Sequence, residues 1–266
     1  MALSLAALLP HSPLLVPEIG KANYSFLEKT IAAYEQIGKK LAEAAIDTII
    51  IISPHGHGSH ESFVLNVAPD MSPDFRDFGC LQIPAPTSGD AILVDQIKNA
   101  LRPDFPIELD SQSNLDYGSG IPLYLLKKYI PGAKALIITT ANNLDPKAQA
   151  DFGARLSGVI AQRNKNIAVI ASGDLSHRLK KKSPGGYSPK GAKFDNRLID
   201  LISEGPSGVE AILAIDKKLA TEAGECGLRP LAITLGMLGG LNWVPEILAY
   251  QTDFGIGYLS VDFKFN

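Results

Sequence analysis

The sequence contains little cysteine and little net charge, and it has no long apolar run. Two cysteines among 266 residues, Cys80 and Cys226, exclude the disulfide framework of a small secreted protein. A formal net charge of −3 excludes the strongly basic surface that binds nucleic acid. The apolar runs are far too short to span a bilayer, and the apolar segment at residues 1–9 lacks the basic region of a signal peptide. We therefore expect a cytoplasmic protein that binds neither nucleic acid nor a membrane.

The rest of the composition, with 45% apolar and 20% charged residues, is typical of a globular protein. Apolar strand-like runs alternate with segments of helical periodicity, and no repeat or linker-like stretch divides the chain. We predict strands over residues 3–9, 48–52, 63–67, 81–83, 135–139, 167–171, 247–251 and 257–263. We predict helices over residues 24–45, 90–101, 121–129, 145–163, 192–203, 207–215 and 228–238. The pattern indicates one α/β domain over residues 1–266, with a central, mostly parallel or mixed sheet flanked by helices.

Three of the five histidines, His11, His55 and His177, follow predicted strands. In an open α/β sheet, ligands bind beyond the carboxyl ends of the strands, and neutral imidazole is the commonest metal ligand in proteins. These positions therefore predict a metal site at one edge of the sheet. His57 and His60 lie close to His55 in a glycine-rich segment, so the alternative for this segment is a flexible, solvated loop.

Two further segments supply carboxylates. Asp174 lies three residues before His177, a spacing that suits one helical turn, and a carboxylate beside an imidazole fixes its tautomer and raises its basicity. Glu222, Glu225 and Cys226 come just before the last predicted helix. Two histidines and one carboxylate form the facial triad of non-haem Fe(II) enzymes, and they also suit Zn²⁺. The alternative is that the glutamates only favour a helix N-terminus, and the spacing does not choose between these interpretations.

Five segments spread over nearly the whole chain carry a family resemblance. They are PHSPLLVPEIG at 10–20, SPHG at 53–56, SGDLSHR at 172–178, ECGLRPL at 225–231 and FGIGYLSVDF at 254–263. With them the chain resembles the class III extradiol ring-cleavage dioxygenases of the protocatechuate 4,5-dioxygenase beta-subunit type. The resemblance is closest to the branch that is fused or adjacent to AMMECR1-type domains, and more distant to the Memo proteins.

The resemblance implies Fe(II) held by His11, His55 and Glu225, with His177 as the acid/base beside the metal. It implies that a catechol-type aromatic diol is opened by O₂, as in the catabolism of aromatic compounds. It also implies a homo-oligomer or an AMMECR1-type partner. Because the family uses only the first histidine of the cluster at 55–60, we expect that His60 is not a ligand and that His57 at most contacts one.

The chain departs from the family pattern at two places. Many relatives have Asp-His-Gly where this chain has Tyr117 between Asp116 and Gly118. Tyr117 can donate a hydrogen bond but does not titrate near neutral pH, so we expect it to orient a substrate. Memo-like relatives carry cysteine at the position of Cys226, which leaves the third ligand open between Glu225 and Cys226. The alternative functions are a Memo-like metal-binding or regulatory protein without dioxygenase activity, and a Zn²⁺-dependent hydrolase.

Overall fold

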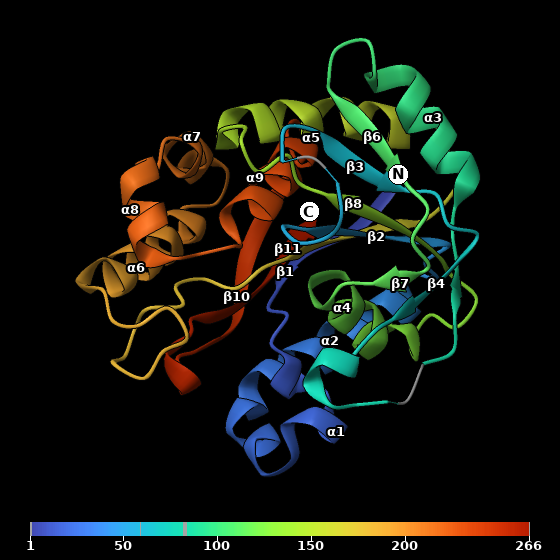
Figure 1. Ribbon diagram of the computed structural model, residues 1–266. Helices are drawn as coiled ribbons and strands as arrows, with labels where there is room; N and C mark the ends of the chain where they lie inside the picture. The colour runs from blue at the N-terminus through green and yellow to red at the C-terminus, as the bar shows by residue number, and fades with distance from the viewer. Residues whose placement is uncertain (1, 59, 82–83, 266) are drawn as a thin grey trace.

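A mixed sheet of eight strands forms the centre of the computed structural model, which describes residues 2–58, 60–81 and 84–265 (Figure 1). The strand order is β10-β11-β1-β9-β2-β8-β3-β6, in which β1, β9, β2 and β8 are mutually parallel. The other four strands flank this core, where β11 pairs antiparallel with β1 and β3 pairs antiparallel with β8. The strands are β1 Leu3–Leu9, β2 Thr48–Ser53, β3 Phe63–Asn66, β6 Ile107–Asp110, β8 Lys134–Thr139, β9 Ile167–Ser172, β10 Trp243–Gln251 and β11 Tyr258–Phe265. The predicted single α/β fold with a mixed sheet is therefore confirmed.

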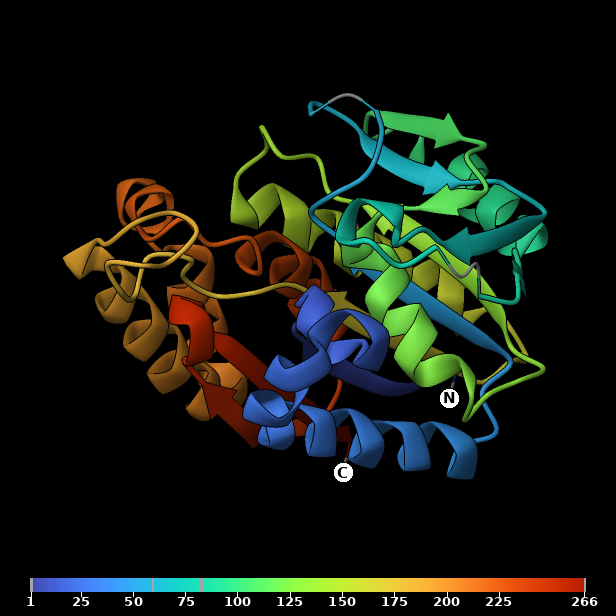
Figure 2. The same ribbon diagram turned by 60° about the horizontal axis from the view of Figure 1, so that its bottom comes forward.

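Helices cover both faces of this sheet, as Figure 2 shows for the blue helix α2 along its lower side. One face packs against α2 (Glu28–Glu43) and α4 (Tyr117–Lys127), near the short α1 (Pro17–Gly20). The opposite face packs against α3 Ala91–Leu101, α5 Pro146–Ala161, α6 Pro189–Ser203, α7 Val209–Leu213, α8 Lys217–Ala223 and α9 Leu228–Met237. In β2, Ile50 and Ile52 pack into one core and Ile49 and Ile51 into the other. The continuous apolar run of this strand thus fills both faces, as expected for a central parallel strand.

A second, smaller sheet lies beside the large one and was not expected from the sequence. It joins β5 (Thr87–Ser88), β4 (Asp70–Pro73) and β7 (Asn114–Leu115) in that order. These strands are too short to show an alternating apolar pattern, which explains why periodicity missed them. The strand predicted over residues 81–83 falls mainly on residues outside the described part of the chain.

The predicted helices agree with the structure best in their interiors and least at their ends. A 3₁₀ segment, Lys21–Leu27, occupies the start of the helix predicted from residue 24, and α8 was not predicted. Helix α4 starts at Tyr117 rather than at residue 121, because the Asp116 side chain caps it by accepting from the Ser119 amide at 3.1 Å. Among the described residues, no helix is long and apolar enough to cross a membrane.

Candidate metal centre

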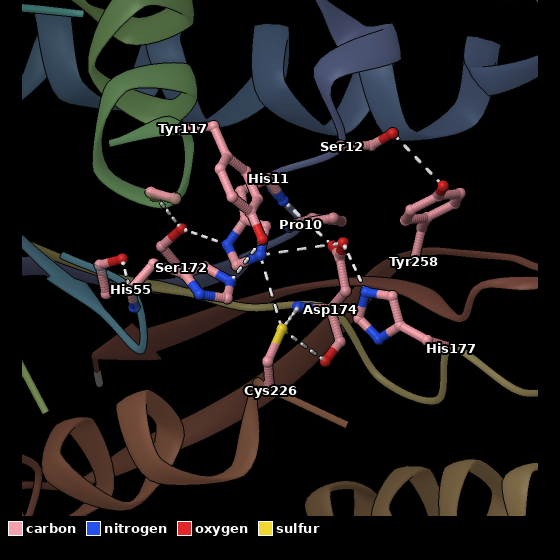
Figure 3. A network of polar contacts seen from close by, with 12 residues as sticks. Pro10, His11, Ser12, His55, Tyr117, Ser172, Asp174, His177, Cys226 and Tyr258 are labelled. Atoms are coloured by element: carbon pink, nitrogen blue, oxygen red, sulfur yellow. Dashed lines mark hydrogen bonds and ion pairs between the residues drawn. The ribbon is translucent and has the colours of Figure 1, made fainter. Parts of the chain in front are cut away.

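His11, His55 and Cys226 meet at the carboxyl edge of the parallel strands (Figure 3). His11 follows β1, His55 follows β2, and Cys226 lies between α8 and α9. One ligand atom from each residue lies within 4.8 Å of the other two. Among the described residues, these three side chains form a group that could hold a metal ion. The two imidazole centroids are 5.0 Å apart, and Cys226 Sγ lies 3.5 Å from His11 Nε2. Imidazole nitrogen and thiolate sulfur are both good ligands for divalent transition metals, so the donor set fits a metal ion.

The environment of His11 fixes the orientation and the tautomer of its ring. The Ser172 hydroxyl donates its only hydrogen to the Gly118 carbonyl, so it must accept from His11 Nδ1–H at 2.9 Å. This leaves the Nε2 lone pair free, and Nε2 is the atom that faces Cys226. His11 is 1% exposed, and burial, followed by His55 and His177, lowers its pKa well below the usual value. A neutral imidazole in a fixed tautomer is the form that binds a metal.

His55 lies against Tyr117, one of the residues at which the chain departs from the family pattern. The Tyr117 hydroxyl lies 2.9 Å from His55 Nε2, and the two rings lie with centroids 4.6 Å apart. Burial is the main cause that lowers the pKa of His55 and raises that of Tyr117, so the imidazole stays neutral and the phenol keeps its proton. A Cβ at Gly118 would lie 2.8 Å from His55 Cδ2, which explains why this position in the first turn of α4 is a glycine. Tyr117 is thus a neutral hydrogen-bonding group beside the cluster.

Cys226 reaches the histidines because two glycines allow two backbone segments to touch. A Cβ at Gly173 would lie 2.3 Å from Gly227 Cα, closer than any side chain tolerates. This approach lets the Cys226 amide donate to the Asp174 carbonyl at 3.1 Å, while the Asp174 amide donates to Cys226 Sγ at 3.3 Å. Burial, followed by the Asp174 carboxylate, raises the pKa of Cys226, so it is a thiol until a metal ion supplies compensating positive charge.

Glu225, the predicted third ligand, does not join this cluster. Its Oε2 accepts the Leu228 amide at 2.7 Å and so caps the start of α9. Burial raises its pKa. This contact matches the alternative interpretation of Glu225, a role at a helix N-terminus. Glu222 also lies outside the cluster, with its Oε1 4.0 Å from Lys218 Nζ on α8. The structure therefore brings Cys226, not Glu225, to the two histidines.

Asp174 and His177 complete the group from the loop that follows β9. This loop is irregular rather than the helical turn that the spacing suggested, yet Asp174 Oδ2 lies 3.7 Å from His177 Nε2 and 3.9 Å from His11 Nε2. Asp174 Oδ1 also accepts the His11 amide at 3.1 Å, and burial raises the pKa of Asp174 to about 6. His177 Nδ1 lies 2.8 Å from the Gly224 carbonyl, which can only accept, so Nδ1 carries the hydrogen of the neutral ring. The lone pair of Nε2 is therefore on the side of Asp174.

The remaining histidines lie outside the cluster. His57 and His60 are exposed, and His60 Nδ1 lies 3.4 Å from the amide nitrogen of Asn142. Their positions agree with the expectation that neither is a ligand, and that expectation stays a prediction.

One supporting residue was missed in the sequence. Asp195 on α6 is fully buried, and its carboxylate accepts from the Ser176 amide at 2.9 Å and from the Tyr250 hydroxyl at 2.8 Å. It thereby fixes the residue before His177. A signal was present, because Asp195 interrupts the apolar stripe of its helix next to Phe194 and three residues before Leu198.

Comparison with known proteins identifies the family. A model of the catalytic LigB subunit of aromatic ring-opening dioxygenase matches residues 5–260. The chain belongs to this family. A protein of Clostridium acetobutylicum that bears only a locus name is 35% identical over 97% of this chain, which spans 57% of that relative's length. The 3,4-dihydroxyphenylacetate 2,3-dioxygenase of Escherichia coli is 25% identical over 89% of this chain and 90% of its own.

A solved structure shares the fold. The crystal structure of an uncharacterised protein of Escherichia coli K12 matches this LigB-family chain with a TM-score of 0.68 at 18% identity, over 98% of this chain and 100% of that one. Membership of the LigB family supports ring-opening dioxygenase chemistry and metal dependence at the level of the family.

Proposed function

We propose that this chain is a non-haem Fe(II)-dependent extradiol dioxygenase that opens a catechol-type aromatic ring with O₂. The observation that carries the proposal is the meeting of His11, His55 and Cys226 at the sheet edge of a LigB-family chain. The similarity to the Escherichia coli 3,4-dihydroxyphenylacetate 2,3-dioxygenase supports an aromatic diol as the substrate class. Both cysteines are free thiols, which supports a cytoplasmic location.

His11 Nε2, His55 and Cys226 Sγ would hold the ion. Bound there, ferrous iron would supply Lewis acidity toward the diol oxygens and a route for electrons from the aromatic ring to O₂. Three protein ligands leave neighbouring coordination positions open, as ring cleavage requires. The Ser172 hydroxyl keeps His11 in the tautomer that the ion needs.

His177 would be the acid/base for the diol. Its Nδ1–H is bound to the Gly224 carbonyl, so the free Nε2 can accept a proton from a diol hydroxyl and return it later. Its side chain is 26% exposed, in contrast to the buried His11, so a substrate can reach it. Asp174 lies next to the same nitrogen and would stabilise the ring once it is protonated. Tyr117 would hold the diol by a hydrogen bond.

A second candidate is a zinc-dependent hydrolase at the same site, and the thiol of Cys226 favours it. Softer sulfur ligands suit zinc, and catalytic zinc sites commonly use three protein ligands with an open fourth position. A Memo-like protein that binds a metal without oxygenase activity would share this ligand set.

Anaerobic reconstitution tests these proposals. The metal-free protein is loaded with Fe(II) or with Zn²⁺ and mixed with catechol, and O₂ is then admitted while the yellow ring-fission product is followed by absorbance. The dioxygenase proposal expects colour and O₂ uptake with Fe(II) alone, and loss of both in Cys226→Ala. Tight binding of Fe(II) and of catechol with no colour and no O₂ uptake would overturn it.

A further inference from the structure

A large cavity of about 810 Å³ opens beside the candidate metal centre. It is bounded by the segment after β8, the α7–α8 connection, α8 and the first turn of α9. None of the potential ligands His11, His55 and Cys226 is among the described residues that line it. Small-molecule pockets commonly measure about 300–1,000 Å³, so this cavity has the size of a ligand site.

Much of the lining is aliphatic and suits an apolar body. Leu144, Leu213, Ile215 and Leu228 come from three segments of the wall, and Leu228 is only 3% exposed. Such surfaces attract an apolar group by removing its area from water, but they do not choose its orientation. The orientation must come from the charged groups of the wall.

Three of the acidic groups in the wall are already occupied by backbone amides. Asp145 accepts from the Ala148 amide at 2.8 Å, Asp216 accepts from two amides of α8, and Glu225 accepts from the Leu228 amide. Each of these carboxylates thereby stabilises the start of a helix.

The cationic groups have no such partners. Among the described residues, Lys147, Lys217 and Arg229 make no ion pair within 4.0 Å and no side-chain hydrogen bond, although the Glu225 carboxylate is near enough to Arg229 for the two charges to interact. Lys147 and Arg229 lie in the first turns of α5 and α9, the end of a helix where a positive charge is least favourable. A bound anion would offset this unfavourable positive charge.

We propose that this cavity binds a small amphipathic carboxylate, with its apolar body against the leucine side chains and its carboxylate on Arg229. A guanidinium presents two parallel N–H donors to a carboxylate and binds it in a fixed orientation. Arg229 is the half-buried member of the three cations, whereas Lys147 and Lys217 lie nearer the rim. Nothing in this binding requires a metal or the ring-opening reaction.

The position of the cavity places the bound ligand against the turn that carries Cys226. Gly224 and Glu225 line the cavity, while the Gly224 carbonyl accepts from His177 and Cys226 faces the histidines. One short turn is therefore shared by the cavity and the metal centre.

Calorimetric titration of the metal-free protein tests the proposal with two probes of the same shape, 4-phenylbutyrate and its neutral amide, 4-phenylbutanamide. We expect the carboxylate to bind at least about ten times more tightly than the amide. Arg229→Gln should reduce the affinity for the carboxylate to that for the amide and leave the affinity for the amide unchanged. Ala214→Trp, which fills the cavity from the exposed end of α7, should weaken both probes.

The matched control is Arg155→Gln, since Arg155 is an exposed arginine of α5 that is paired with Asp104 at 2.7 Å and does not line the cavity. It should leave both affinities unchanged. Equal binding of acid and amide, an equal loss in Arg155→Gln, or no binding of either probe at millimolar concentration would each overturn the proposal. Circular dichroism of every variant separates a lost ligand site from a lost fold.

Discussion

The third ligand can be identified by separating the stability of the metal-free protein from the stability that a metal adds. Glu225 accepts the Leu228 amide at the start of α9, and loss of a side-chain hydrogen bond to a first-turn amide of a helix costs about 0.5–2 kcal/mol. For a chain of this size, a loss of about 1 kcal/mol lowers the melting temperature by about 2–4 °C. Glu225→Ala should therefore lower the melting temperature of the metal-free protein by this amount and leave the metal-dependent increase intact.

Cys226→Ala should have the opposite effect. A metal at roughly 100 times its Kd stabilises the folded protein by about 2.7 kcal/mol, or about 5–10 °C here. Because Cys226 supplies the sulfur of the cluster, its removal should abolish most of that increase with Fe(II) under anaerobic conditions and with Zn²⁺. The assay is thermal unfolding followed by circular dichroism with and without metal. If Glu225→Ala loses the increase and Cys226→Ala keeps it, the ligand assignment is wrong.

Three further predictions follow from the contacts around the centre. Ser172→Ala removes the acceptor that fixes the His11 tautomer, so metal affinity in a metal titration should fall about 10–100-fold. The control Ser12→Ala, which removes a hydroxyl that bonds Tyr258, should leave the metal affinity unchanged. His177→Ala should keep metal and bound catechol but lose about 10²–10⁴ in turnover, and Tyr117→Phe should lose less; metal loss in His177→Ala would make His177 a ligand. Burial raises the pKa of Asp195 to about 6, so the folded chain holds a proton that the unfolded chain has released. The stability that this proton contributes is complete below about pH 4 and is lost as pH rises through about 6, by about 2–3 kcal/mol at most. Asp195→Asn should reduce that loss in urea unfolding between these pH values, and an unchanged slope would refute the assignment.

The sequence was sufficient for the strands of the large sheet other than β6, which was not predicted, and for two members of the cluster. The apolar run at Thr48–Ser53 indicated a strand buried on both faces, and a parallel strand delivers the residue after its carboxyl end to a shared edge. His11 and His55 follow two such strands, so their approach follows from topology alone. The small sheet and α8 were not predictable in this way, because short elements carry too few periods of an apolar pattern.

The choice between Glu225 and Cys226 could not be made from spacing. Both residues lie in the same turn before α9, and either could have faced the histidines. What decides is a long-range contact, the approach of Gly173 to Gly227, which fixes the backbone so that the Cys226 amide bonds the Asp174 carbonyl. With the backbone held there, the carboxylate of Glu225 bends back to the amide at the start of the helix. A contact between segments about 50 residues apart leaves no local signal in the sequence.

A thiolate in place of a carboxylate preserves one property of the centre and changes another. Two neutral imidazoles and one anion leave a divalent ion with a net charge of +1 in either case, so the attraction for the oxygens of a diol is retained. Sulfur, however, binds through a single soft atom, which favours zinc and other thiophilic ions more than a carboxylate does. If the proposed function holds, the attraction for the diol oxygens would therefore depend on the charge of the site, while the preference among metals would depend on Cys226. For this reason the metal content and the reaction must be measured on the same preparation, since neither follows from the other.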